Sequence, residues 1–330
     1  MPIKIIEKIM DGKYLEPSDL STMVERMREG KLNGLQFVSF LTAMETRNRI
    51  NGIDINECAN FIKALRIPTE SSLEGVLCNA GTGGGWTKTL NIGTASAVII
   101  ATSGINTLKI GSKGITTNSG SRNVLENWGI DTNADVGKVI SSVEKAQIGY
   151  FDFSKIVPLG ERAGLRSPLH YLGPLCNPID LSYKVLGCIK EEHLRTIEPI
   201  LEKLCDNYLL SFNPNIDEIS LTDPTLIVEK RNNKRKEYIF NPSEHKLPHI
   251  SYQDIAHPGD VKKGADMLWE VLVGNKKGSI RDILSLNAGA GIYLAGKEKS
   301  IRDGFYSAQD LLESGKVKAK LNEWKKYQST

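Results

Sequence analysis

A glycine-rich loop, Gly81-Thr82-Gly83-Gly84-Gly85, lies between a predicted strand and a helix that begins near Asn91. Glycine allows positive φ and leaves backbone N–H groups uncovered, and a helix N-terminus adds partial positive charge, so an anion is the natural ligand. The loop matches neither G-x-G-x-x-G nor the P-loop. The residues alone leave two interpretations open: a phosphate cradle, or a tight turn that binds nothing.

A second loop, rich in glycine and serine, follows the next predicted strand. It runs from Lys109 through Gly111 and Lys113 to Ser121 and Arg122. Loops after successive parallel strands meet at the carboxyl edge of a sheet, so two such loops can surround one ligand. The hydroxyls and cations suit a polyanionic sugar phosphate, and the alternative is a solvated loop with incidental cations.

Two adjacent carboxylates, Asp217 and Glu218, follow a strand-like run and precede a β-branched one. Mg²⁺ keeps several waters and takes one or two protein oxygens together with ligand phosphates, which fits such a pair. Acidic dipeptides by themselves are more typical of protein surfaces. Asp217 and Glu218 are therefore candidate metal residues only in combination with the glycine loops.

Two regions of different pattern position these residues. Residues 3–66 carry apolar side chains at three-to-four spacing, which predicts a helical layer. From about residue 74, short β-branched runs alternate with glycine turns and helical patterns, which predicts an α/β unit. The predicted strands are 75–79, 107–110, 209–212 and 225–230, and the predicted helices are 94–103, 123–128, 191–207, 261–273 and 280–295.

The composition is that of a folded globular protein. The 330 residues are 40% hydrophobic and 25% charged, which excludes disordered and collagen-like classes. The 42 basic and 39 acidic residues nearly cancel, so no global field favours nucleic acid or an anionic membrane. The basic run 230–236 predicts a solvated hairpin with Asn232-Asn233 at its turn.

The cysteines and the N-terminus indicate a reducing compartment. The 5 cysteines show neither metal-ligand nor disulfide-framework spacing, and we expect buried free thiols. The N-terminus lacks the features of a signal peptide, and no apolar run approaches the ~18 residues of a membrane span. We therefore expect a cytoplasmic protein without a membrane partner.

An ordered set of motifs extends over almost the whole chain. It comprises Gly34–Ala43, the Gly81 loop, Asn91-Ile92-Gly93-Thr94, Ser119-Gly120-Ser121, Leu172-Gly173-Pro174-Leu175-Cys176-Asn177-Pro178, Asp217-Glu218 and Leu286-Asn287-Ala288-Gly289-Ala290. This set resembles the anthranilate phosphoribosyltransferase family, a relative of the pyrimidine nucleoside phosphorylases. The resemblance implies a small all-helical domain (1–70, with a returning segment near 162–185) packed on a larger α/β domain (71–330). That domain would have a central, mostly parallel sheet, the active cleft would lie between the domains, and the helices would form a homodimer.

The function implied by this resemblance is Mg²⁺-dependent transfer of phosphoribosyl from phosphoribosyl pyrophosphate to the nitrogen of an aromatic acceptor. The family uses anthranilate and serves tryptophan biosynthesis, and it needs no covalent nucleophile, because catalysis is electrostatic and positional. On the same basis Asp217 and Glu218 would hold Mg²⁺. The donor site would comprise Gly81, Gly84, Thr89, Asn91, Thr94, Lys109, Thr117 and Ser121, and the acceptor site Gly81, Ile110, Ser112 and Pro174.

Several positions depart from the family pattern. Gly85 and Gly93 stand where the family has aspartate and serine, and Ile110 and Ser112 replace histidine and asparagine. Gly160 stands where an arginine would meet the acceptor carboxylate, and the lost charge-assisted hydrogen bond is worth about 1.5–3 kcal/mol. We therefore expect a different aromatic amine, amide or base as acceptor. Two alternatives are a phosphate-dependent nucleoside phosphorylase and a non-catalytic paralogue that binds a ligand or nucleic acid.

Overall fold

The computed structural model describes residues 2–67, 69, 73–83, 87–111, 120–157 and 167–329, apart from the side chain of His170. Five positions that the sequence singled out lie outside these residues. They are Gly84, Gly85, Ser112, Thr117 and Gly160, and the same holds for Lys113 and Ser119 of the second loop.

The described residues form helices on both sides of one sheet. The helices are α1 (Pro2–Met10), α2 (Pro17–Arg28), α3 (Gly34–Asn51), α4 (Ile55–Leu65), α5 (Ile92–Thr102), α6 (Ser121–Asn127), α7 (Val136–Ala146), α8 (Leu169–Leu172), α9 (Glu191–Leu201), α10 (Val261–Leu272), α11 (Ser279–Leu294), α12 (Ile301–Glu313) and α13 (Lys316–Tyr327). The strands are β1 (Leu77–Gly81), β2 (Thr107–Gly111), β3 (Ile148–Asp152), β4 (Tyr183–Cys188), β5 (Asn207–Phe212), β6 (Thr225–Arg231) and β7 (Lys234–Phe240).

The sheet has the order β3-β2-β1-β4-β5-β6-β7. Strands β1 to β5 are mutually parallel, whereas β6 is antiparallel to β5 and to β7. The chain builds outward from β1 through β2 to β3 and then returns to place β4 on the other side of β1. The order therefore reverses at β1 and β4, and such a switch point is where open α/β sheets bind ligands.

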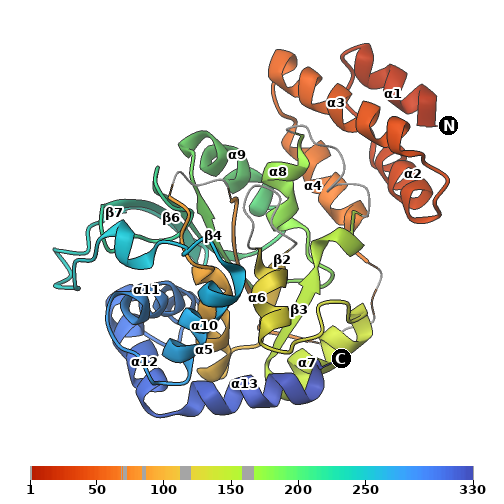
Figure 1. Ribbon diagram of the computed structural model, residues 1–330. Coiled ribbons are helices and arrows are strands. Elements are labelled where there is room, and N and C mark those ends of the chain that lie inside the picture. The colour runs from red at the N-terminus through yellow and green to blue at the C-terminus, as the bar shows by residue number, and fades with distance from the viewer. Residues whose placement is uncertain are drawn as a thin grey trace.

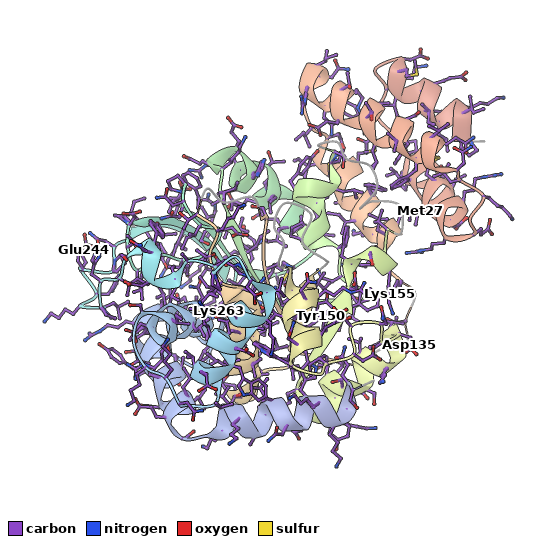
Figure 2. All side chains as sticks on the ribbon, viewed as in Figure 1. Met27, Asp135, Tyr150, Lys155, Glu244 and Lys263 are labelled. Carbon is purple, nitrogen blue, oxygen red and sulfur yellow. The ribbon has the colours of Figure 1, made fainter. Side chains whose placement is uncertain are left out.

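Two apolar clusters cover the two faces of the sheet. One joins Leu77, Tyr150 and Val185 to helices α5 and α10–α13, and the other joins Cys78 and Leu186 to α9 and the N-terminal helices. Figure 1 shows α1, α2 and α3 projecting from one end, with α4 between them and the sheet. Figure 2 labels Met27 in the N-terminal helix α2 and Tyr150 in the strand β3, and both side chains are buried.

The helical layer is held together by a buried ion pair. Arg47 of α3 pairs with Glu57 of α4, and both side chains are almost fully buried. The same guanidinium donates to Lys13 O (2.8 Å), and Glu57 accepts from Leu15 N (2.7 Å). These bonds offset part of the cost of burying the two charges, and they tie α3, α4 and the α1–α2 connection together. Arg47 Nε is buried without a hydrogen-bond partner among the described residues.

The structure confirms the α/β class, the mostly parallel sheet and the N-terminal helices. It also confirms five buried free cysteines and the hairpin, whose turn residues Asn232 and Asn233 have φ of 52° and 59°. The helix predicted over 191–207 is too long, because it ends at Leu201 and β5 starts at Asn207. The strand predicted at 75–79 is Leu77–Gly81, and residues 183–185 of the returning segment lie in β4.

The helices α11 and α12 pack backbone to backbone through two glycines. A Cβ added at Gly304 would overlap Gly289 O, and one added at Gly289 would overlap the Gly304–Phe305 backbone. Because α11 carries Asn287, this contact fixes the helix that borders the candidate site.

We predict that Gly304→Ala destabilises the protein by about 1–3 kcal/mol, because the methyl group meets backbone that cannot move aside. The matched control is Gly34→Ala in α3, where an added Cβ meets nothing within 4 Å and alanine is the better helix former. Urea unfolding followed by circular dichroism measures both variants. Equal stability of Gly304→Ala and the native protein would contradict the packing argument.

Candidate active site

The carboxyl ends of β1 and β4 meet a loop that follows β5 and folds back over them. Asp217 lies in this loop, and its carboxylate and backbone fill the space where side chains of Gly81 and Gly187 would stand. A Cβ at Gly81 would overlap Asp217 Oδ2, and one at Gly187 would overlap Asp217 O. Glycine is required at both strand ends because the acidic loop approaches so closely.

The glycine-rich loop after β1 bonds directly to this acidic loop. Gly83 N donates to Asp217 Oδ2 (2.8 Å), and Thr87 N donates to Asn215 O (3.2 Å). Thr82 N in turn donates to Gly187 O (2.9 Å) at the end of β4. The structure therefore brings together the glycine loop and the carboxylate pair that the sequence treated as separate motifs.

Side chains within the loop and beyond it hold the loop in place on both sides of the carboxylates. Asn287 of α11 accepts from Ile219 N and donates to Ile219 O, both at 3.0 Å. On the other side, Asn213 Oδ1 accepts from Asn215 N (2.9 Å). Tyr252 closes the base of the loop by donating to Asp223 Oδ2 (2.8 Å). Asn287, which the sequence analysis named only as part of a motif, thus positions the residue next to Glu218.

Lys109 of β2 brings a buried cation to the same edge. Its Nζ donates to Asn79 O (3.2 Å), while Asn79 Nδ2 donates to Gly93 O (2.7 Å) at the start of α5. A Cβ added at Gly93 would lie 3.8 Å from Lys109 Nζ, so there is room for a side chain at this position. Burial lowers the pKa of Lys109, and the charges of Asp217 and Glu218 oppose this shift.

The first turns of α5 and α6 are joined at this edge by a hydroxyl pair. Thr94 Oγ1 donates to Ser121 Oγ (2.9 Å). Ser121 packs so closely on Gly111, the last residue of β2, that an added Cβ there would lie 2.7 Å from Ser121 Cβ. Two helix N-termini therefore meet beside Lys109, which is a favourable place for an anion.

The two carboxylates are deeply buried and electrostatically costly. Burial raises the pKa of Asp217, against the bond from Gly83 N–H and the charge of Lys109. Burial and then the charge of Asp217 raise the pKa of Glu218 well above its usual range, and Lys109 again opposes the shift. Such perturbation of two neighbouring acids by burial and by each other is typical of functional sites.

Three buried polar atoms around this cluster have no hydrogen-bond partner among the described residues. They are Glu218 Oε2, Thr82 Oγ1 and Asn79 Oδ1. Unpaired buried oxygens are rare and costly, and oxygens are the ligands that hard cations prefer. Nowhere in the described ranges do three or more His, Cys, Asp or Glu side chains gather as a metal cage. The residues therefore fit an ion such as Mg²⁺ that keeps waters and ligand phosphates.

Four other predicted site residues lie in other parts of the fold. Thr89 forms an isolated bridge with Ala256, and Asn91 precedes α5 as its N-cap residue. Ile110 is buried in the apolar cluster on the helical-layer face of the sheet. Pro174 lies in a 3-10 turn, Gly173–Leu175, after α8. The roles assigned to these four residues stay predictions.

Sequence reasoning missed Asn79 and Gly187. Asn79 is a polar residue within the apolar strand Leu77–Gly81. Gly187 lies inside the strand Tyr183–Cys188, and a glycine within a strand is a known sign of close backbone approach. That strand was itself missed, because Lys184 interrupts its apolar run.

Comparison with known proteins places the chain in one family. The model of the glycosyl transferase family, a/b domain, matches residues 74–318. An anthranilate phosphoribosyltransferase from Acetivibrio thermocellus is 31% identical over 341 residues, with 97% of this chain and 95% of the relative covered. One from Clostridium kluyveri is 27% identical over 327 residues, with 96% and 97% covered.

Solved structures agree with this assignment. The anthranilate phosphoribosyltransferase from Thermus thermophilus has a TM-score of 0.85 and 25% identity, with 98% of this chain and 99% of that chain covered. The enzyme from Saccharomyces cerevisiae, solved with phosphoribosyl pyrophosphate and Mg, shares the fold at a TM-score of 0.81 and 17% identity, with 99% of this chain and 97% of that chain covered. The chain belongs to the glycosyl transferase family of pentosyltransferases.

We predict that Lys109→Met makes the ligand-free protein more stable at neutral pH, by about 1 kcal/mol or more, because burial disfavours the ammonium more than the charges of Asp217 and Glu218 favour it. The lowered pKa means that the unfolded chain holds this proton more tightly than the folded one. The stability of the native protein therefore rises as the pH increases from the lowered pKa of Lys109 in the folded state towards its ordinary pKa of 10.5. The difference in stability between the native protein and Lys109→Met shrinks over the same pH range.

Urea unfolding of both proteins at several pH values between neutral and 10 measures this difference. A Lys109→Met variant that is clearly less stable at neutral pH would contradict it.

Proposed function

We propose that the protein transfers phosphoribosyl from phosphoribosyl pyrophosphate to the nitrogen of an aromatic acceptor, with Mg²⁺ bound on the Asp217–Glu218 side. The observation that carries the proposal is the bond from Gly83 N to Asp217 Oδ2 (2.8 Å). It joins the anion-binding glycine loop to the acidic pair. A pyrophosphate–metal complex needs both kinds of group at one place.

The chain's own residues supply charge and position rather than a nucleophile. The N-termini of α5 and α6 and the Lys109 ammonium face negative charge that builds up on the leaving pyrophosphate. The described loop N–H groups of Thr82, Gly83 and Thr87 instead donate within the protein and hold the loop on the acidic pair. Mg²⁺, when bound, neutralises further phosphate charge. Because these groups are fixed before the substrate arrives, they stabilise developing charge without reorganising. The acceptor nitrogen then displaces pyrophosphate at the anomeric carbon of the ribose.

The acceptor side favours a molecule without a carboxylate. Ile110 stands where the family has histidine, and Gly160 stands where it has arginine. An acceptor carboxylate would lose its charge-assisted partner. An aromatic amine, amide or base is therefore the proposed acceptor.

One observation favours a phosphorylase as the second candidate. Gly93 leaves open space 3.8 Å from Lys109 Nζ, with no hydroxyl there for a metal-bound donor. Inorganic phosphate and a nucleoside would need no metal at this position. Phosphate-dependent cleavage of a pyrimidine nucleoside in the presence of EDTA would favour this candidate.

Part of the charge of the basic run in β6 and β7 is neutralised by acidic side chains. Arg235 pairs with Glu198 and Glu237, and Lys230 lies 3.6 Å from Glu202. No helix in the described part of the chain is long and apolar enough to cross a membrane.

The helical layer exposes apolar side chains such as Ile3, Met10, Leu35 and Ile50, which is compatible with the proposed homodimer.

The donor half of the proposal predicts saturable binding of phosphoribosyl pyrophosphate that requires Mg²⁺. Isothermal titration calorimetry at near-physiological salt, with Mg²⁺ and with EDTA, measures it. Absence of binding in both conditions would contradict the proposal.

The acceptor half of the proposal predicts that anthranilate has a lower kcat/KM than at least one uncharged compound. Pyrophosphate release in the presence of anthranilate, aniline, benzamide or adenine measures these values.

We further predict that Gly81→Ala weakens Mg²⁺-dependent donor binding at least about tenfold, or about 1.4 kcal/mol, because its methyl group displaces the Asp217 carboxylate. The matched control is Gly93→Ser, where an added Cβ fits and restores the family's hydroxyl. We expect it to bind the donor as tightly as the native protein or more tightly. Circular dichroism confirms folding of both, and equal affinities of the two variants would refute the role of the Gly81 contact.

A further inference from the structure

Lys184 is a fully buried lysine in β4 that the donor site does not use. Its Nζ donates to Pro174 O (2.6 Å) and contacts Cys78 Sγ (3.1 Å). Within the described part of the chain its polar partners are thus a carbonyl oxygen and a thiol, not a carboxylate. Burying an ammonium without a counter-charge is costly, and an apolar side chain would fill the same volume without that cost.

The Lys184 side chain lies on the helical-layer face of the sheet. Lys184 pairs in register with Cys78 of the neighbouring strand β1, and Cys78 and Leu186 belong to the apolar cluster on that face. Nearby, burial raises the pKa of Cys176 to about 12, and the Lys184 charge opposes this shift. The ammonium therefore sits inside an apolar region and reaches from the sheet to the segment that follows α8.

The carbonyl that accepts this bond belongs to a turn that links the helical side to the sheet. Pro174 is the middle residue of Gly173–Leu175, which follows α8 and precedes β4. The turn packs closely, because a Cβ at Gly173 would lie 3.3 Å from Phe153 Cζ. The bond from Lys184 ties this turn to β4 and, through the Cys78 contact, to β1. These are the strands whose ends carry Gly187 and Gly81.

We propose that Lys184 is a positioning residue that fixes the Gly173–Leu175 turn, and with it Pro174 on the acceptor side, relative to the donor site. Loss of Lys184 then loosens the turn and weakens acceptor use, while donor binding is retained. The catalytic half of this inference rests on the proposed function. The positional half can be measured without any substrate.

Hydrogen–deuterium exchange of the ligand-free protein tests the positional half. In Lys184→Met, an apolar replacement of similar length, the N–H of Cys176, which donates to Gly173 O (3.0 Å) across the turn, should exchange at least about tenfold faster, because the turn loses a hydrogen bond from a charged donor. The matched control Cys78→Ala removes only the thiol contact and should leave this rate within about threefold of native. Unchanged exchange in Lys184→Met, or faster exchange spread over the whole sheet, would overturn the proposal.

Kinetics test the catalytic half. With Mg²⁺, phosphoribosyl pyrophosphate and the best acceptor of the panel above, Lys184→Met should raise the acceptor KM about tenfold and leave the donor Kd, from calorimetry, within about twofold. An equal loss in donor affinity would overturn the positioning role. If the native protein binds no donor, the proposed function fails, and the exchange rates alone still decide whether Lys184 fixes the turn.

Discussion

No Cβ fits at Gly81 or at Gly187, because the carboxylate and the backbone of Asp217 occupy the space beside these two strand ends. This close approach is the constraint on which the rest of the site depends. It presses the loop after β5 against β1 and β4, and it brings Gly83 N within 2.8 Å of Asp217 Oδ2. The glycine loop and the acidic pair thus meet at the switch point of the sheet.

The candidate site buries charged side chains, and this burial lowers the stability of the folded protein. Asp217, Glu218 and Lys109 are all buried, and burial is the leading cause of each pKa shift. The surrounding fold supplies the rigidity that keeps them there. Asn287 holds the loop backbone beside Glu218, and the glycine contact between α11 and α12 fixes the helix that carries Asn287. A pocket arranged before the substrate arrives is what electrostatic catalysis requires.

The sequence predicted much of this arrangement and failed at identifiable places. The glycine loop, Lys109 and the carboxylate pair were found because their chemistry is local in sequence. The fold class followed from the change of pattern near residue 74. Strand β4 was missed because Lys184, buried in the structure, reads as a surface residue, and β3 and α7 were also missed.

Long-range contacts account for the rest. The bonds of Asn287 to Ile219 join residues 68 positions apart, and nothing in local periodicity indicates such a pairing. The closeness of Asp217 to Gly187 depends likewise on the order of strands in the sheet. Gly84, Ser112 and Thr117 lie outside the described residues, so their roles stay predictions.

The proposed function requires the acidic pair and the glycine loop to bind one metal–pyrophosphate complex. The most direct measurement is the anomalous difference density of Mn²⁺ in crystals soaked with phosphoribosyl pyrophosphate. We predict a peak bound to a carboxylate oxygen of Asp217 or Glu218, directly at about 2.0–2.2 Å or through one ordered water, with the pyrophosphate on the Gly81 loop. Pyrophosphate bound away from this loop, or a Mn²⁺ peak remote from both carboxylates, would contradict it.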